Sequence, residues 1–373
     1  MRLASAARLL HRACRPACRA MASAAAPGRY GSGPLPPATW QQSMLRVRDP
    51  QKRREREERG QVAAALTPRS LAFYRDVLGL SLVDKYDFPA SKFSLYFLQS
   101  LPLGAVPAHE PGSDAAHAAL WATPGVTLEL THNWESEEVY HAGNEPGDGF
   151  GHIALAVQDL TAAVVRLDAA GVRFKKRPEE GRMRSIAFVF DPDGYWVELV
   201  ERGRDPADAL PSPFFTLAQT MVRVKEPQVA LAFYRSLGMT LVRETHASDF
   251  SIYFLATLPT DSVVPDPTSP EAREFVKAEL YPRRVPVLEL THNHGTENQP
   301  DFAHRTGNEA GKRGFGHLGF LVPDVYAETA RLQAAGVAFQ KLPDQGSMKG
   351  LAFARDPDGY WIELIKRGQD GRF

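Results

Sequence analysis

Side chains of the types that bind metal ions occur in this chain as two sets, in the same order and within repeated phrases. Each set has one Gln, two Glu and one His: Gln42, Glu129, His152 and Glu198, and then Gln219, Glu289, His317 and Glu363. Carboxylate, imidazole and amide oxygen donors suit a divalent ion of the Zn, Ni, Co or Mn type. Both cysteines, Cys14 and Cys18, lie near the N-terminus, which excludes thiolate ligands and disulfides from the rest of the chain. The two sets are therefore candidates for two metal sites.

The phrases that carry these residues show that the chain is a fused duplicate. Asp191–Glu198 returns as Asp356–Glu363, Gly149–His152 as Gly314–His317, Leu128–Asn133 as Leu288–Asn293, and Gln42–Val47 as Gln219–Val224. Each repeat runs through strand-like and helix-like segments twice. In the first repeat, strands are expected at 44–47, 93–98, 126–130, 152–157, 186–190 and 195–200, and helices at 70–79 and 160–170. The pattern predicts an α+β protein made of four strand–helix–multistrand units.

A metal ion held by two carboxylates, one imidazole and one amide oxygen favours a particular kind of chemistry. The carboxylates neutralise the dication, while the neutral amide leaves it a strong Lewis acid that can bind both oxygens of an enediolate and ease proton removal beside a carbonyl. One Glu would then act as the general base. Taken singly, each residue also has an ordinary structural interpretation, such as an exposed Glu on a strand or a core His. Repetition by itself demonstrates only duplication.

Bulk composition narrows the class of protein. The chain has 373 residues, 43% of them hydrophobic and 24% charged, and its formal net charge is zero. This length suggests two domains. The balanced charge gives no reason to expect a nucleic-acid or membrane partner, and no apolar run reaches the roughly 18 residues of a spanning helix.

The predicted boundaries follow the repeats. We expect a targeting segment and flexible lead at 1–39, a first domain at 40–204 with an insertion at about 52–69, a linker at 205–214, a second domain at 215–367, and a tail at 368–373. The insertion is either a charged helical extension or a stretch without function.

The first twenty residues carry five Arg, and no acidic residue precedes Asp49, which is typical of a mitochondrial presequence. A disordered basic tail is the alternative interpretation. Met21 offers a second start and a cytoplasmic form.

The repeated phrases resemble those of lactoylglutathione lyase, glyoxalase I, in its tandem two-domain form. The resemblance covers nearly all of residues 40–367. It implies a vicinal-oxygen-chelate fold, in which four βαβββ modules form two glyoxalase domains. It also implies isomerisation of the hemithioacetal of glutathione and methylglyoxal to S-D-lactoylglutathione. Zinc is the expected metal, with nickel or another divalent ion open, at one ion per site.

The resemblance also assigns the residues, because each family site combines modules from opposite repeats. The first site would hold Gln42, Glu129, His317 and Glu363, and the second Gln219, Glu289, His152 and Glu198. Glu363 and Glu198 correspond to the general base of the family.

The resemblance also implies residues that contact the substrate, but the two sites do not match the family equally well. The implied residues are Arg46, Asn133, Arg313 and Lys341 at the first site, and Arg223, Asn293 and Lys176 at the second. Where the family has an Arg before Gly-Phe-Gly-His, the second site has Asp148, which predicts weaker substrate binding there by roughly 1–3 kcal/mol.

Two rival functions stay open. An extradiol dioxygenase on the same fold would need two His and one Glu around iron, and Gln at the first ligand position argues against it. A non-catalytic small-molecule binding protein is the other rival, although complete ligand sets in both repeats argue against it. The expected partner is the hemithioacetal, and we expect a monomer whose two repeats pack together.

Overall fold

A computed structural model of the chain describes residues 28–48, 70–102, 104–122, 125–181, 183–202 and 215–369. The basic segment Met1–Ala20, the insertion at 52–69 and the linker at 205–214 lie outside these residues, so their predictions remain untested. Within the described residues, no helix is long and apolar enough to cross a membrane.

The described chain contains four modules, each with the order strand, helix and three strands. The first has β1 (Thr39–Arg46), α1 (Ser70–Ala72) continuing as the π-helix η1 (Phe73–Val77), β2 (Ser81–Phe88), the 3-10 turn η2 (Pro89–Ser91), β3 (Phe93–Gln99), α2 (Asp114–Ala122) and β4 (Thr127–Asn133). The second has β5 (Phe150–Val157), α3 (Leu160–Ala169), β6 (Phe174–Lys176), β7 (Ile186–Phe190) and β8 (Trp196–Glu201).

The second repeat has the same plan. Its first module has β9 (Thr216–Arg223), α4 (Pro227–Ser236), β10 (Met239–His246), β11 (Phe250–Thr257), α5 (Pro270–Glu274) continuing as the π-helix η3 (Phe275–Leu280), and β12 (Val287–Asn293). Its second has β13 (Phe315–Val322), α6 (Val325–Ala334), β14 (Phe339–Lys341), β15 (Ala352–Arg355) and β16 (Trp361–Lys366). The predicted α+β class with four βαβββ modules is confirmed.

Local sequence explains where equivalent helices begin and end. Asp159 and Asp324 precede α3 and α6, and each carboxylate accepts a hydrogen bond from a backbone N–H of the first helical turn. Gly171 and Gly336 follow the same helices with positive φ angles of 69° and 82°, the conformation that ends a helix most easily at glycine.

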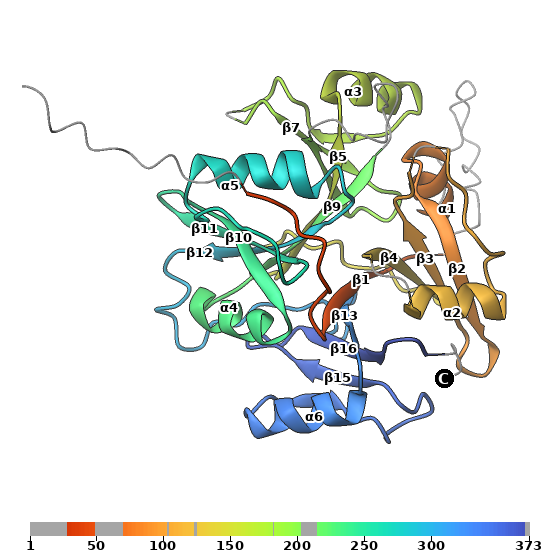
Figure 1. The fold of residues 1–373 in the computed structure, drawn as a ribbon. Coiled ribbons are helices and arrows are strands. Elements are labelled where there is room, and N and C mark those ends of the chain that lie inside the picture. The colour runs from red at the N-terminus through yellow and green to blue at the C-terminus, as the bar shows by residue number, and fades with distance from the viewer. Residues whose placement is uncertain are drawn as a thin grey trace, which may run out of the picture.

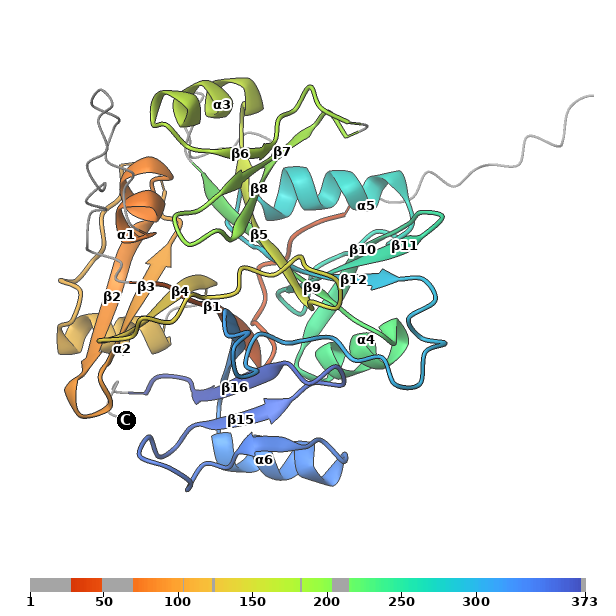
Figure 2. The ribbon, with the colours of Figure 1, turned by 180° about the vertical axis from the view of Figure 1, so that it is seen from behind.

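The modules pair across the repeats rather than within them. One eight-stranded sheet has the order β14-β15-β16-β13-β1-β4-β3-β2, and the other has the order β10-β11-β12-β9-β5-β8-β7-β6. The seams are the antiparallel pairs β1–β13 and β5–β9. In Figure 1 the red strand β1 of the first module accordingly lies beside the blue strand β13 of the last. Figure 2 shows the other sheet from behind, with β5 beside β9.

Contacts between equivalent residues join the two sheets. The rings of Phe150 and Phe315 stack with centroids 4.9 Å apart, and the hydroxyls of Ser43 and Thr220 are 2.9 Å apart. Because each pair consists of matching positions in the two repeats, both contacts lie where a two-fold relation between the repeats requires them. This arrangement agrees with the expectation that the repeats pack together.

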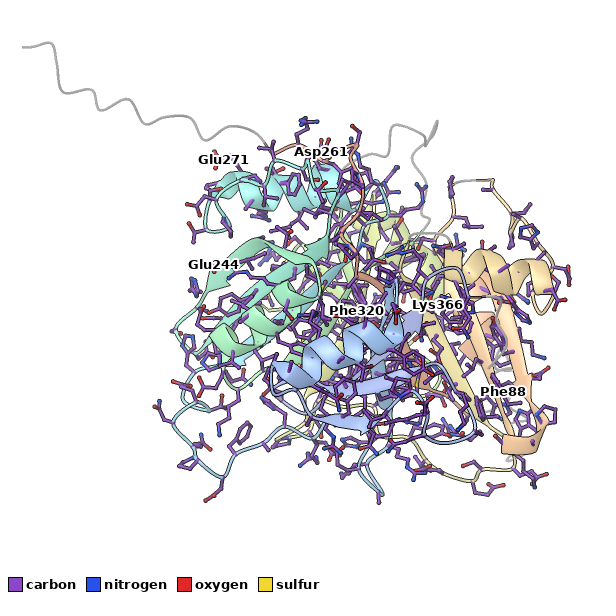
Figure 3. The ribbon with its side chains drawn as sticks, turned by 60° about the horizontal axis from the view of Figure 1, so that its bottom comes forward. Phe88, Glu244, Asp261, Glu271, Phe320 and Lys366 are labelled. Atoms are coloured by element: carbon purple, nitrogen blue, oxygen red, sulfur yellow. The ribbon has the colours of Figure 1, made fainter. Side chains whose placement is uncertain are left out.

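The N-terminal segment, residues 28–38, packs against the second repeat, although the sequence suggested a flexible lead. Backbone hydrogen bonds of 2.8 Å join Arg29 and Val263 in both directions, and Asp261 accepts from the backbone N–H groups of Ser32 and Gly33. Figure 3 labels Asp261 beside this segment. The difference arises because these bonds join residues more than 200 positions apart, which local composition does not reveal.

The repeats differ in how they fill the space at one end of the sheet. In the first repeat a cavity of about 210 Å³ is lined by the polar side chains of Gln41, Gln99 and Thr127 together with Ala116. Strand register matches the three polar positions to Ala218, Ala256 and Val287, which belong to a packed apolar cluster in the second repeat. Val276 matches Ala116 and belongs to that cluster.

This difference predicts opposite responses to exchanging the matched residues. Val276→Ala should lower the free energy of unfolding by about 2 kcal/mol, because it opens a cavity in a filled core. Ala116→Val should cost nothing and can add up to about 1 kcal/mol, because the added methyl groups enter existing space. Urea unfolding of the metal-free chain measures both, and equal destabilisation by the two variants would contradict the assignment of the cavity.

Candidate metal centres

Four neighbouring strands of one sheet each contribute one side chain to the first centre, which comprises Gln42, Glu129, His317 and Glu363. These residues lie on β1, β4, β13 and β16. The Nε2 atom of Gln42 lies 2.6 Å from Oε2 of Glu129 and 2.9 Å from Oε2 of Glu363. Nε2 of His317 lies 3.3 Å and 3.1 Å from the same two carboxylate oxygens. The expected grouping of residues from opposite repeats is therefore present in the structure.

The second centre comprises Gln219, Glu289, His152 and Glu198, on β9, β12, β5 and β8. Nε2 of Gln219 lies 2.6 Å from an oxygen of each glutamate, and 3.4 Å from Nε2 of His152. Nε2 of His152 lies 3.2 Å from Glu198 and 3.8 Å from Glu289. The two centres thus have the same donors in the same arrangement.

The glycines of the repeated Gly-Phe-Gly-His phrase are explained by close packing beside the centres. A Cβ atom on Gly316 would lie 2.1 Å from the terminal methyl of Met44, and one on Gly151 would lie 2.5 Å from the sulfur of Met221. A larger residue at either position would force the end of that methionine side chain to move.

Protonation balances the buried carboxylates in the absence of a cation. Burial alone would lower the pKa of His317, but the charges of Glu363 and Glu129 outweigh it and raise the pKa to about 9. At the second centre, burial and the charge of Glu198 raise the pKa of Glu289 to about 7, against the opposing effect of His152. The pKa of His152 is also raised, because its bond and charge interaction with Glu198 outweigh burial.

The donor set fits a divalent metal ion. In each centre the two Glu and the His offer three ligand atoms within 4.8 Å of one another, all on buried residues. Ligands at the usual metal distances of about 2.0–2.2 Å lie roughly 3–3.5 Å apart, close to the His–Glu spacings here. Within the part of the chain that the structure describes, the buried Oε1 of Gln42 has no hydrogen-bond partner, and a half-turn of the amide would present that oxygen to the ion.

A cavity of about 130 Å³ opens onto the first centre. Its walls are mainly apolar and include Phe88, Phe97, Trp121 and Phe353, while Arg46 is a charged lining residue. Figure 3 labels Phe88, the last residue of β2. Such a site can shield a small reacting group from water and leave a charged end of the substrate near Arg46.

The predicted arginines hold similar places in the two repeats. Arg46 donates to Oδ1 of Asn308 at 2.8 Å, and Arg223 donates to Oδ1 of Asn144 at 2.9 Å. Each arginine therefore meets a loop of the opposite repeat. Asn144 and Asn308 are not among the predicted residues, although the phrase Gly-Asn-Glu occurs at 143–145 and again at 307–309.

The predicted asparagines have different surroundings. Asn133 donates to the hydroxyl of Tyr140 at 3.0 Å. Asn293 ends β12, and its backbone carbonyl accepts from Thr296. His304 occupies the position in the second repeat that corresponds to Tyr140, since Arg305 and His141 follow them in equivalent loops.

The predicted lysines order neighbouring loops. Nζ of Lys341 donates to the carbonyls of Met348 and Leu351, both at 2.7 Å. Lys176 donates in the same way to the carbonyls of Met183 and Ile186. Met348 and Leu351 also line the cavity of the first centre, so Lys341 shapes that wall whether or not it also contacts a substrate.

Asp148 and Arg313 differ in exposure as well as in charge. Arg313 is about half exposed and lies 3.5 Å from Glu138. Asp148 is only 3% exposed and is held by Arg305 at 2.7 Å and by His141 at 2.6 Å. The negative charge is therefore compensated locally, but no arginine takes the position that Arg313 has at the first centre.

Comparison with known sequences agrees with the duplication. The family described as the Glyoxalase/Bleomycin resistance protein/Dioxygenase superfamily matches residues 62–199 and 216–364. The chain is 37% identical over 306 residues to the lactoylglutathione lyase of Schizosaccharomyces pombe, covering 80% of this chain and 92% of that protein. It is 38% identical over 317 residues to glyoxalase I of Saccharomyces cerevisiae, covering 80% and 89%.

Among solved structures, glyoxalase I from Zea mays matches with a TM-score of 0.59 at 24% identity, covering 89% of this chain and 93% of that one. This likeness supports the expected vicinal-oxygen-chelate fold. Since the family matches both repeats, and the two yeast proteins align over nearly their whole length, the chain belongs to the lactoylglutathione lyase (glyoxalase I) family.

Proposed function

We propose that the protein is a glyoxalase I that isomerises the glutathione–methylglyoxal hemithioacetal to S-D-lactoylglutathione at two metal centres. The observation that carries the proposal is the meeting of Gln, Glu, His and Glu from opposite repeats, twice, on buried neighbouring strands. We further propose zinc as the ion at each centre, with nickel or another divalent metal as the alternative.

The reaction moves a proton between two adjacent carbon atoms. A divalent ion bound by the four side chains supplies Lewis-acid polarisation of the substrate oxygens. Glu363 at the first centre, and Glu198 at the second, take the proton from one carbon and return it to its neighbour. Each is buried in contact with a His and a Gln, an environment that excludes bulk water and holds the carboxylate in place.

Substrate recognition at the first centre is assigned to Arg46, Asn133, Arg313 and Lys341. Arg46 lines the cavity beside the metal ligands, and arginine binds a carboxylate of glutathione through two parallel hydrogen bonds. Arg223, Asn293 and Lys176 have the corresponding roles at the second centre. The apolar walls accommodate the small methylglyoxal end.

The ligand types disfavour the two rival functions. An extradiol dioxygenase would use two His and one Glu, whereas each centre here has one His, two Glu and one Gln. A binding protein without catalysis would give no reason for a carboxylate next to His in both copies. Consumption of oxygen by the purified protein in the presence of a catechol would instead support the extradiol dioxygenase function.

The sequence also suggests where the protein acts. We propose a mitochondrial location directed by Met1–Ala20, with a cytoplasmic form that starts at Met21.

Replacing the proposed bases tests the assignment of the reaction. Glu363→Gln together with Glu198→Gln should lower kcat by about 100- to 10,000-fold, the usual contribution of a general base. Each single variant should keep the activity of the other centre. Formation of the thioester, followed by ultraviolet absorbance, measures the rate. Glu179→Gln on the surface is the control, and an active double variant would refute the proposed bases.

The same single variants compare substrate binding at the two centres. The Glu363→Gln chain reports the second centre, where Asp148 replaces the arginine, and the Glu198→Gln chain reports the first. The KM of the second centre should be higher by roughly five- to a hundred-fold, corresponding to about 1–3 kcal/mol for a charged hydrogen bond lost. Equal KM values in the two chains would contradict this expectation.

Metal binding should release protons, because the centres hold protons when no ion is bound. The pKa of His317 is about 9, so at neutral pH its imidazolium must lose a proton before the nitrogen can bind an ion. Affinity should therefore fall as the pH is lowered and rise up to about pH 9. Calorimetric titration with Zn²⁺ in buffers of different ionisation enthalpy measures the release. Identical heats in all buffers would disprove it.

A further inference from the structure

The second centre has a hydrogen bond that the first centre lacks. The hydroxyl of Tyr281, which follows η3, donates to Oε1 of Gln219 at 2.9 Å. The other end of the same amide, Nε2, faces Glu198 and Glu289. Tyr281 is buried, so its hydroxyl meets the amide away from bulk water.

At the first centre Trp121 takes the place of this tyrosine. Trp121 precedes the first residue of β4 by six positions (127 − 121), and Tyr281 precedes the first residue of β12 by six (287 − 281). The indole N–H of Trp121 donates to the hydroxyl of Tyr86 at 2.7 Å. Oε1 of Gln42 is buried without a hydrogen-bond partner among the described residues.

This difference affects what happens when the glutamine turns its oxygen toward a metal ion. A half-turn of the amide exchanges Oε1 and Nε2, so the NH₂ group then points away from the ion. A hydroxyl can both donate and accept, so Tyr281 satisfies Gln219 in either orientation. At the first centre, no hydroxyl among the described residues bonds the corresponding atom of Gln42, so Gln42 lacks the partner that serves Gln219 in both orientations, and buried N–H groups without a partner are costly.

We propose that Tyr281 is a positioning residue that orients Gln219 and thereby strengthens metal binding at the second centre. The proposal rests on the proposed function, because it takes the two centres to be metal sites. Partners of this kind, which orient a metal ligand without touching the ion, change metal affinity by about 10- to 100-fold when removed.

A second difference between the repeats acts in the opposite direction. Strand register places Arg243 on β10 where β2 has Asp84, and Arg243 interacts electrostatically with Glu289. A nearby cation weakens the binding of a metal ion at the second centre. The two centres therefore cannot be compared directly with each other, and the test must change Tyr281 within one centre.

The experiment isolates each centre in the full-length chain. His317→Gln leaves only the second centre able to bind Zn²⁺, and His152→Gln leaves only the first. Each chain is titrated with Zn²⁺ in competition with a chromophoric chelator of known affinity, with and without Tyr281→Phe. Tyr86→Phe is the matched control, because it removes a tyrosine hydroxyl near the first centre that accepts from Trp121 and does not donate to Oε1 of Gln42.

Tyr281→Phe should weaken Zn²⁺ binding by about 10- to 100-fold in the His317→Gln chain and leave it within about two-fold in the His152→Gln chain. Saturating Zn²⁺ should restore activity with an unchanged KM, which general damage to the fold would not allow. Tyr281→Trp, which introduces the first-repeat residue, should have the same effect and replaces the Phe variant if that variant fails to fold.

Unchanged affinity at the second centre, or equal loss at both centres, would overturn the role of Tyr281 while leaving the metal centres in place. If neither single-centre chain binds Zn²⁺, the proposed metal centres themselves are refuted, and the role of Tyr281 with them.

Discussion

Antiparallel pairing of β1 with β13, and of β5 with β9, is the constraint on which the rest of the structure depends. Gln42 and Glu129 lie on one side of the first seam, and His317 and Glu363 lie on the other. Neither repeat therefore contains a complete centre. Tyr195 and Tyr360 link the two sheets, because their hydroxyls donate to the backbone carbonyls of Arg46 and Arg223 in the other module of the same repeat. Each centre therefore requires both repeats to be folded and paired.

The same pairing also buries several ionisable groups close together. Two carboxylates and an imidazole are brought into a buried space with an amide as their neutral neighbour, and isolated charges are expensive to bury. In the metal-free protein, bound protons compensate part of this buried negative charge, in line with the raised pKa values of His317 and Glu289. A divalent cation compensates this charge better, because one ion balances two carboxylates. Ligand geometry and charge thus lead to the same chemistry, that of a Lewis acid beside a carboxylate base.

Duplication preserved the ligands but not their surroundings. The four donors of each centre match in type, strand and order, whereas the residues around them differ. Asp148 corresponds to Arg313, Trp121 corresponds to Tyr281, and a cavity in the first repeat corresponds to a filled apolar core in the second. These differences lie at positions for which we propose substrate binding or ligand orientation, and in the core.

The sequence by itself determined the duplication, the α+β class and the eight candidate ligands, because these follow from repeated phrases and from local periodicity. It did not reveal β2, β6 or α2, or the packing of residues 28–38 on the second repeat. The bonds of Lys341 to its own loop, of Asn308 to Arg46 and of Tyr281 to Gln219 likewise appeared only in the structure. The family resemblance anticipated which repeat completes each centre, but only the sheet order shows it. The contacts between the repeats share one physical reason: they join residues that are distant in sequence, and only the tertiary structure decides which of these residues meet.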